Sequence, residues 1–102
     1  MKRMAKKLWS VFTDDMEHCI ETGTTQVHRH HIFGASNRKK SEKHGFVIPI
    51  AYWLHEFQEG SIHNNPNEGL DLKWKKKAQE YYENHYGSRE DFIQEYGRNY
   101  LD

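Results

Sequence analysis

The sequence contains eight histidines, six of them between positions 28 and 63, and five of these six could do chemistry together: His28, His30, His31, His55 and His63. Neutral imidazole binds divalent metal ions, and its reference pKa of about 6.5 also suits it to take a proton from water. Adjacent residues of a strand point to opposite faces, so His30 and His31 are not expected to bind one ion together. One of this pair can face a metal while the other faces a substrate. These residue types are therefore suited to hold a divalent ion, which can act as a Lewis acid, or to transfer a proton.

The elements that must position these histidines are short. Residues 26–33 alternate like a strand, and residues 46–48 form a β-branched run that we expect to close at Pro49. Between them, residues 34–45 are highly charged and lack apolar periodicity, which predicts a loop. Residues 50–59 then fit a helix. The pattern places the histidine pair on a first strand and His55 on a short helix.

Helices are expected on both sides of this centre. Residues 1–18 are predicted to form an N-terminal helix or arm, and residues 66–102 a C-terminal helical part. In the latter, an apolar stripe from Leu70 to His85 predicts one helix. Ser88 is a typical N-cap for a second helix, which Gly97 ends.

Length and composition indicate a single domain over residues 1–102. The chain has 14% aromatic residues, enough for a small core, and a single cysteine, Cys19, which excludes a disulfide framework and a four-cysteine zinc site. No stretch of about 18 apolar residues could span a membrane, and no signal peptide is visible, so a cytoplasmic protein is expected. The formal net charge is zero, but the basic residues are clustered and could form a basic face.

The central pattern resembles the ββα-metal, or HNH, nuclease motif. The resemblance covers about residues 19–63 and rests on the segment Val27-His28-Arg29-His30-His31-Ile32, on the strand at 46–48, and on Leu54-His55 after Pro49. Residues 33–43 and 70–101 resemble small HNH-like proteins of phages and prophages of Gram-positive bacteria, which are similar to phage recombination-enhancement nucleases. The resemblance implies an α+β fold, a ββα-metal core with flanking N-terminal and C-terminal helices, and the cytoplasm of a bacterial host cell.

The resemblance also implies roles for the histidines. His30 would be a metal ligand, His31 the general base and His55 the second ligand. For the third ligand, Glu59 lies one helical turn beyond His55 and could share its ion directly, whereas His63 reaches only if the chain turns back. The resemblance favours His63. Three imidazoles favour Zn²⁺, Mn²⁺ or Ni²⁺ as the one divalent ion, and Glu59 would favour Mg²⁺.

Two departures from the family pattern matter for activity. Cys19 alone remains of the two cysteine pairs that hold a structural zinc in many HNH domains, so no zinc knuckle is expected and apolar packing must replace it. The asparagine of the HNH name would fall near Phe46, which cannot orient an imidazole. Asn37 is the side chain we expect to orient His31 instead, with a backbone carbonyl as the alternative.

These observations lead to one functional hypothesis with alternatives. The chain is expected to be a metal-dependent HNH-type endonuclease that hydrolyses DNA, in phage recombination or DNA processing. A catalytically degenerate DNA-binding accessory module is the alternative, and a metal-free helical DNA-binding domain comes third. A homodimer is expected if both strands are cut, and a recombinase is a candidate partner. The expected phosphate-binding residues are basic: Arg29, Arg38, Lys39, Lys40 and Lys43.

Overall fold

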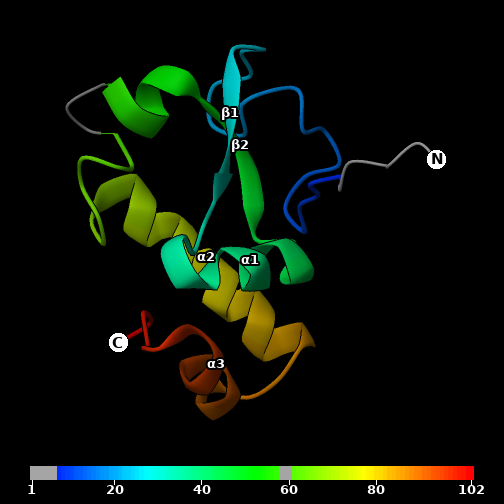
Figure 1. Cartoon of the computed structure of the whole chain (residues 1–102), viewed down its shortest axis with the longest axis vertical. Coiled ribbons are helices and arrows are strands. Elements are labelled where there is room, and N and C mark those ends of the chain that lie inside the picture. The colour runs from blue at the N-terminus through cyan, green and yellow to red at the C-terminus, as the bar shows by residue number, and fades with distance from the viewer. Residues whose placement is uncertain (1–6, 58–60) are drawn as a thin grey trace.

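The structure is a computed structural model that describes residues 7–57 and 61–102. It contains a two-stranded antiparallel sheet and several helices, and is therefore a small α+β domain (Figure 1). In chain order its elements are β1 (Val27–His31), the 3-10 turn η1 (Ala35–Asn37), α1 (Arg38–His44), β2 (Val47–Ala51), the π-helical turn η2 (Trp53–Phe57), α2 (Gly69–His85) and α3 (Arg89–Tyr96). None of the helices in these described parts of the chain is long and apolar enough to cross a membrane.

The sheet extends beyond its predicted limit at Pro49. In the antiparallel register, Arg29 lies opposite Pro49, and β2 continues to Ala51, which lies opposite Val27. The carbonyl of Pro49 accepts a hydrogen bond from the Ile20 amide at 2.9 Å, on the edge of β2 turned away from β1. The N and C=O of one strand residue point to the same edge, so the missing N–H of Pro49 costs the sheet no ladder bond.

A short helix replaces the loop that was predicted between the strands. Helix α1 buries Ser41, whose hydroxyl donates to the Phe33 carbonyl at 2.7 Å and accepts from the Phe33 amide at 3.1 Å. Gly45 ends the helix with a φ of 77°, a conformation that favours glycine. The prediction was wrong because the inner face of α1 is polar, so the sequence shows no apolar stripe there.

Of the two forms predicted for the N-terminal segment, a helix or an arm, residues 7–18 form an arm. The Val11 amide donates to the Gly45 carbonyl at 2.9 Å, and the Trp9 indole donates to the Glu42 carbonyl at 2.9 Å. The Phe12 ring packs edge-on against Trp74, with centroids 5.4 Å apart. The apolar side chains whose spacing fits a helical stripe instead lie on an irregular segment, where they cover the core.

Helices α2 and α3 confirm the predictions made for the C-terminal part. The Ser88 hydroxyl accepts from the Asp91 amide at 3.1 Å while the Asp91 carboxylate accepts from the Ser88 amide, which completes a capping box. In Figure 1, α2 runs beneath the sheet and α3 folds back at its far end. The core that these helices share with the sheet contains many aromatic side chains, and Cys19 is buried in it. Its fully buried centre includes Phe46 and Phe92.

Candidate metal centre

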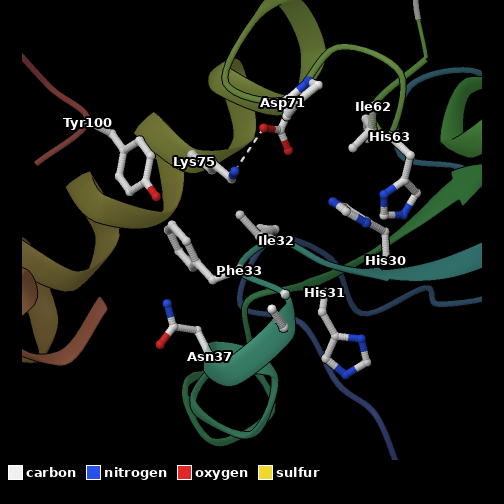
Figure 2. A pocket seen from close by; sticks show the side chains of 13 residues that line it. His30, His31, Ile32, Phe33, Asn37, Ile62, His63, Asp71, Lys75 and Tyr100 are labelled. Carbon is white, nitrogen blue, oxygen red and sulfur yellow. Dashed lines mark ion pairs between the residues drawn. The ribbon is translucent and has the colours of Figure 1, made fainter. Parts of the chain in front are cut away.

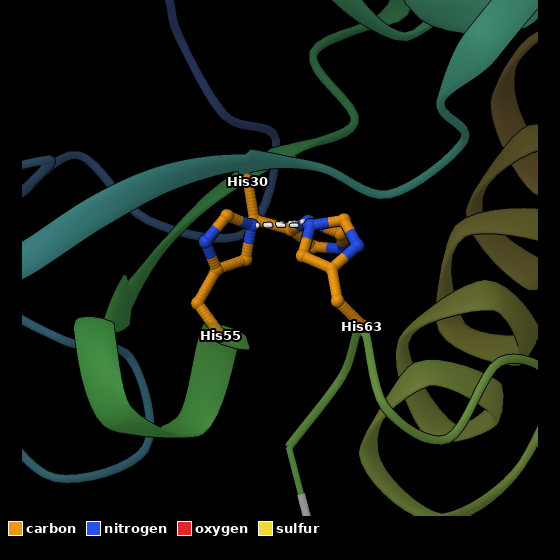
Figure 3. Close-up of side chains that lie close together, drawn as sticks. All are labelled: His30, His55 and His63. Carbon is orange, nitrogen blue, oxygen red and sulfur yellow. Dashed lines mark hydrogen bonds between the residues drawn. The ribbon is translucent and has the colours of Figure 1, made fainter. Parts of the chain in front are cut away.

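Three of the predicted ligands, His30, His55 and His63, meet at one point. His30 comes from β1, His55 from η2, and His63 from the segment that follows (Figure 3). The Nε2 atom of His55 lies 3.2 Å from Nδ1 of His30 and 2.8 Å from Nε2 of His63. All three ligand atoms lie within 4.8 Å of one another. The structure therefore brings together side chains that are distant in the sequence.

Backbone hydrogen bonds place His63 beside His55. The Ile62 amide donates to the Leu54 carbonyl at 2.7 Å, and the His63 amide donates to the His55 carbonyl at 3.0 Å. The Asn64 side chain continues this register by donating to the Glu56 carbonyl at 3.1 Å. The chain thus turns back along η2, which is the condition under which His63 could reach the cluster. Glu59, the rival ligand, lies outside the described residues.

Helix η2 also differs from the prediction. A helix was expected over residues 50–59, but β2 continues to Ala51 and the helical turn begins only at Trp53. Its π-helical form is wider than an α-helix, and such turns occur frequently at functional sites. Trp53 and Leu54 pack against the core, as expected in the absence of a zinc knuckle. His55 thus directly follows two residues that pack against the core.

Burial keeps two imidazoles of the cluster neutral. His30 is 6% exposed, and its pKa is lowered to about 3, first by burial and then by the neighbouring His55 and His63. The pKa of His55 is lowered to about 4 by burial and by His63 and His28, against the opposite effect of Glu56. A neutral imidazole has a free lone pair on one nitrogen, which is the form that binds metal ions.

The donor set fits a divalent ion. Zinc-bound nitrogens lie about 2.0–2.1 Å from the ion, so two of them at octahedral to tetrahedral angles are about 2.8–3.4 Å apart. The separations of His55 Nε2 from the two other ring nitrogens, 2.8 and 3.2 Å, fall within this range. Nε2 of His55 faces the ring nitrogens of both His30 and His63. One proton would form a good hydrogen bond to only one of these nitrogens at a time, whereas one cation can bind all three. The cluster could therefore hold a metal ion, with three imidazoles favouring a transition metal.

Two cavities adjoin the cluster. One, of about 360 Å³, is lined by His30, His31 and His63 and reaches Lys75 and Tyr100 (Figure 2). The other, of about 280 Å³, is also lined by the cluster and includes Arg29, Arg38 and Glu56. Solvent-filled space next to the ligands is what a catalytic metal site requires for water and substrate.

His31 points away from His30 and His63, as expected for adjacent strand residues (Figure 2). Its Nε2 atom lies 2.8 Å from Oε2 of Glu42 in α1. Asn37, which was expected to orient this ring, instead donates its amide to the Tyr96 carbonyl at 3.1 Å and accepts from Lys40 at 3.4 Å. The sequence does not point to Glu42, because the loop predicted over residues 34–45 gives no reason to place residue 42 opposite residue 31.

The basic residues fall into two groups. Arg38, Lys39 and Lys43 are exposed on α1, and Arg38 also lines the cavity beside the cluster. Arg29 lies at the same cavity but pairs with Glu17 at 2.7 Å. Lys40 is different, because its ammonium group donates to the Glu95 carbonyl and ties α1 to the C-terminal part. The prediction of Lys40 as a phosphate-binding residue conflicts with this role inside the fold.

Comparisons of the chain with models of protein families, with curated proteins and with solved structures found no match. The candidate site is therefore defined by its own geometry and donor set.

Proposed function

We propose that this chain is a metal-dependent endonuclease of the HNH type that hydrolyses DNA phosphodiester bonds. The observation that carries the proposal is the convergence of His30, His55 and His63, with His31 on the opposite side of the same strand. The order of β1, β2 and η2 is compatible with a ββα-metal core. The proposed setting is phage DNA recombination or processing in a bacterial host cell, where double-strand cleavage would need two copies of the site.

His30, His55 and His63 would hold the ion. When bound, a divalent ion supplies positive charge that stabilises the leaving oxygen of the phosphodiester. His31 acts on the attacking water. With its proton on Nε2, directed at the Glu42 carboxylate, its Nδ1 atom is free to accept a proton from that water. Glu42 thus fixes the tautomer and orientation of the base.

The exposed cations of α1 and the cavity rim would bind the DNA backbone. Arg38 is placed for this at the cavity beside the cluster, and Lys39 and Lys43 extend the same charge along α1. Phosphate contacts of this kind depend on salt, because each one releases counterions from the DNA. They hold the duplex at the site without selecting a sequence.

Supercoiled-plasmid nicking tests the proposal. Wild type is assayed with Mg²⁺, Mn²⁺, Ni²⁺ or Zn²⁺, each against EDTA, together with His31→Ala, His30→Ala and the control His85→Ala. His85 is an exposed histidine of α2, far in sequence from the cluster. We expect metal-dependent nicking in wild type and His85→Ala and its loss in the other two variants, with circular dichroism unchanged. Nicking that persists in EDTA or in His31→Ala would contradict the proposal.

A DNA-binding accessory module is the second candidate. The His31 side chain is 7% exposed and that of Glu42 17%, so this pair is as enclosed as a structural contact. In that case no ion would support cleavage, although DNA affinity would be measurable and would fall with added salt. A recombinase partner is compatible with both candidate functions, the nuclease and the accessory module. Adding the host recombinase to the nicking assay would test it.

A further inference from the structure

We propose that His28 is a positioning residue for the metal centre, which holds His55 in the tautomer that binds the ion. The inference rests on the proposed metal site and concerns a residue outside its three ligands. The Nδ1 atom of His28 lies 2.9 Å from the Nδ1 atom of His55. His55 therefore has one ring nitrogen in the cluster and the other against His28.

The proton count assigns the roles in this contact. His55 directs Nε2 at His30 and His63, so that nitrogen must offer a lone pair to an ion. A neutral imidazole carries one proton, which must then lie on Nδ1 of His55. Because this N–H faces Nδ1 of His28, His28 accepts the hydrogen bond and keeps its own proton on Nε2. Metal-bound histidines are commonly oriented by such an acceptor on the second nitrogen.

The position of His28 on β1 explains why it can do this. His28 and His30 are two residues apart on the strand and therefore share a face. The His55 ring lies between them, with its centroid 5.1 Å from that of His28 and 5.0 Å from that of His30. Strand β1 thus supplies the ligand His30 and also His28, the residue that orients the neighbouring ligand His55.

Other interpretations of the contact are less favourable. The Glu56 carboxylate lies 3.8 Å from the same nitrogen of His55, too far for a hydrogen bond. Ligand atoms of His28, His55 and Glu56 also lie within 4.8 Å of one another and could bind a second ion. That ion would require His55 to lose its remaining ring proton while bound to the first. One ion per chain, with His28 as hydrogen-bond acceptor, is the simpler arrangement.

Metal affinity, not activity, tests this inference. Zn²⁺ and Co²⁺ binding are measured by calorimetry with a competing chelator, and the number of ions by native mass spectrometry. The variants are His28→Ala, His28→Asn and the control His85→Ala. Asparagine can place its amide oxygen near the position of histidine Nδ1, so it restores an acceptor that alanine removes. His28 is exposed, so neither variant should unfold the chain.

We expect one ion in every variant, with affinity about 10- to 100-fold weaker in His28→Ala and close to wild type in His28→Asn and His85→Ala. The Co²⁺ absorption spectrum should change in His28→Ala and be restored in His28→Asn. Unchanged affinity in His28→Ala would overturn the inference, as would two ions in wild type and one in His28→Ala. If the ion binds and His28 behaves as expected but no DNA is cut, only the proposed nuclease function fails.

Discussion

Nε2 of His31 and Oε2 of Glu42 lie 2.8 Å apart, and the two residues come from β1 and α1 on either side of η1. The pair resembles in its chemistry a base held by a carboxylate, in which the carboxylate fixes the imidazole tautomer and stabilises the charge that forms on proton transfer. The elements that create it are separated by only one short turn. The position of the proposed base therefore depends on α1 being helical.

Replacing the carboxylate tests this relationship. We expect Glu42→Gln to lower the nicking rate about 10- to 100-fold, because the amide no longer stabilises a protonated His31. DNA affinity measured in EDTA should be unchanged. Glu90→Gln, which removes an exposed carboxylate from α3, serves as the control. A Glu42→Gln variant with the wild-type nicking rate would show that the pair is structural.

An ion at the cluster should stabilise the fold. A ligand present at 100 times its dissociation constant adds about 2.7 kcal/mol if it binds the folded state alone. For a domain of this size that corresponds to a rise in melting temperature of roughly 10–20 °C. We expect the rise with Zn²⁺ or Mn²⁺, its reversal by EDTA, and its absence in His63→Ala. Because His63 is exposed, the metal-free melting temperature of that variant should stay near that of wild type.

Acid should destabilise the metal-free protein. The pKa values of His30 and His55 are lowered to about 3 and about 4 in the folded state, mainly by burial. Between those values and about 6.5, the unfolded chain binds more protons than the folded one, so the free energy of unfolding decreases as pH falls. Urea unfolding at pH 7, 5.5 and 4.5 in EDTA measures this slope. His30→Asn should flatten it, and an unchanged slope would argue against burial of a neutral His30.

Replacing two nearby basic residues, Arg38 and Lys40, should affect two different properties, DNA binding and stability. Arg38→Ala removes a cation from the cavity rim and is expected to weaken DNA binding and reduce its salt dependence, with little effect on stability. Lys40→Ala should instead lower the free energy of unfolding by about 1 kcal/mol, because it removes the bond to the Glu95 carbonyl. Fluorescence anisotropy at several salt concentrations and urea unfolding give the two readouts. A larger loss of DNA affinity in Lys40→Ala than in Arg38→Ala would reverse this assignment.

Local signals predicted the C-terminal part of the fold well. The N-cap at Ser88 and the stop at Gly97 depend on residues within one or two turns of each other, and both are present in the structure. The histidine cluster was also predicted, because residue types that bind metal are few and their order along the chain was informative. Its third member could be chosen by resemblance but not by spacing, since only backbone pairing with η2 brings His63 back.

The errors lie where tertiary contacts decide the local structure. Helix α1 is stabilised by the bonds of Ser41 to Phe33, and β2 passes through Pro49 because Ile20 occupies its outer edge. Neither contact leaves a periodic pattern in the sequence. Because a loop was predicted where α1 lies, the sequence did not point to Glu42, and Asn37 was predicted to orient His31 instead. One local error thus produced both mistakes at the proposed base.

The separation of the three ligands along the chain has a consequence for folding. His30 and His55 are 25 residues apart, and His63 follows 8 residues later, so one ion would act as a cross-link between segments that are independent in the unfolded chain. The ligand set does not exist until β1, η2 and the returning segment have packed together. Metal would therefore bind late in folding and slow unfolding more than it speeds folding. The lifetime of the folded chain would then follow the metal supply of the cell.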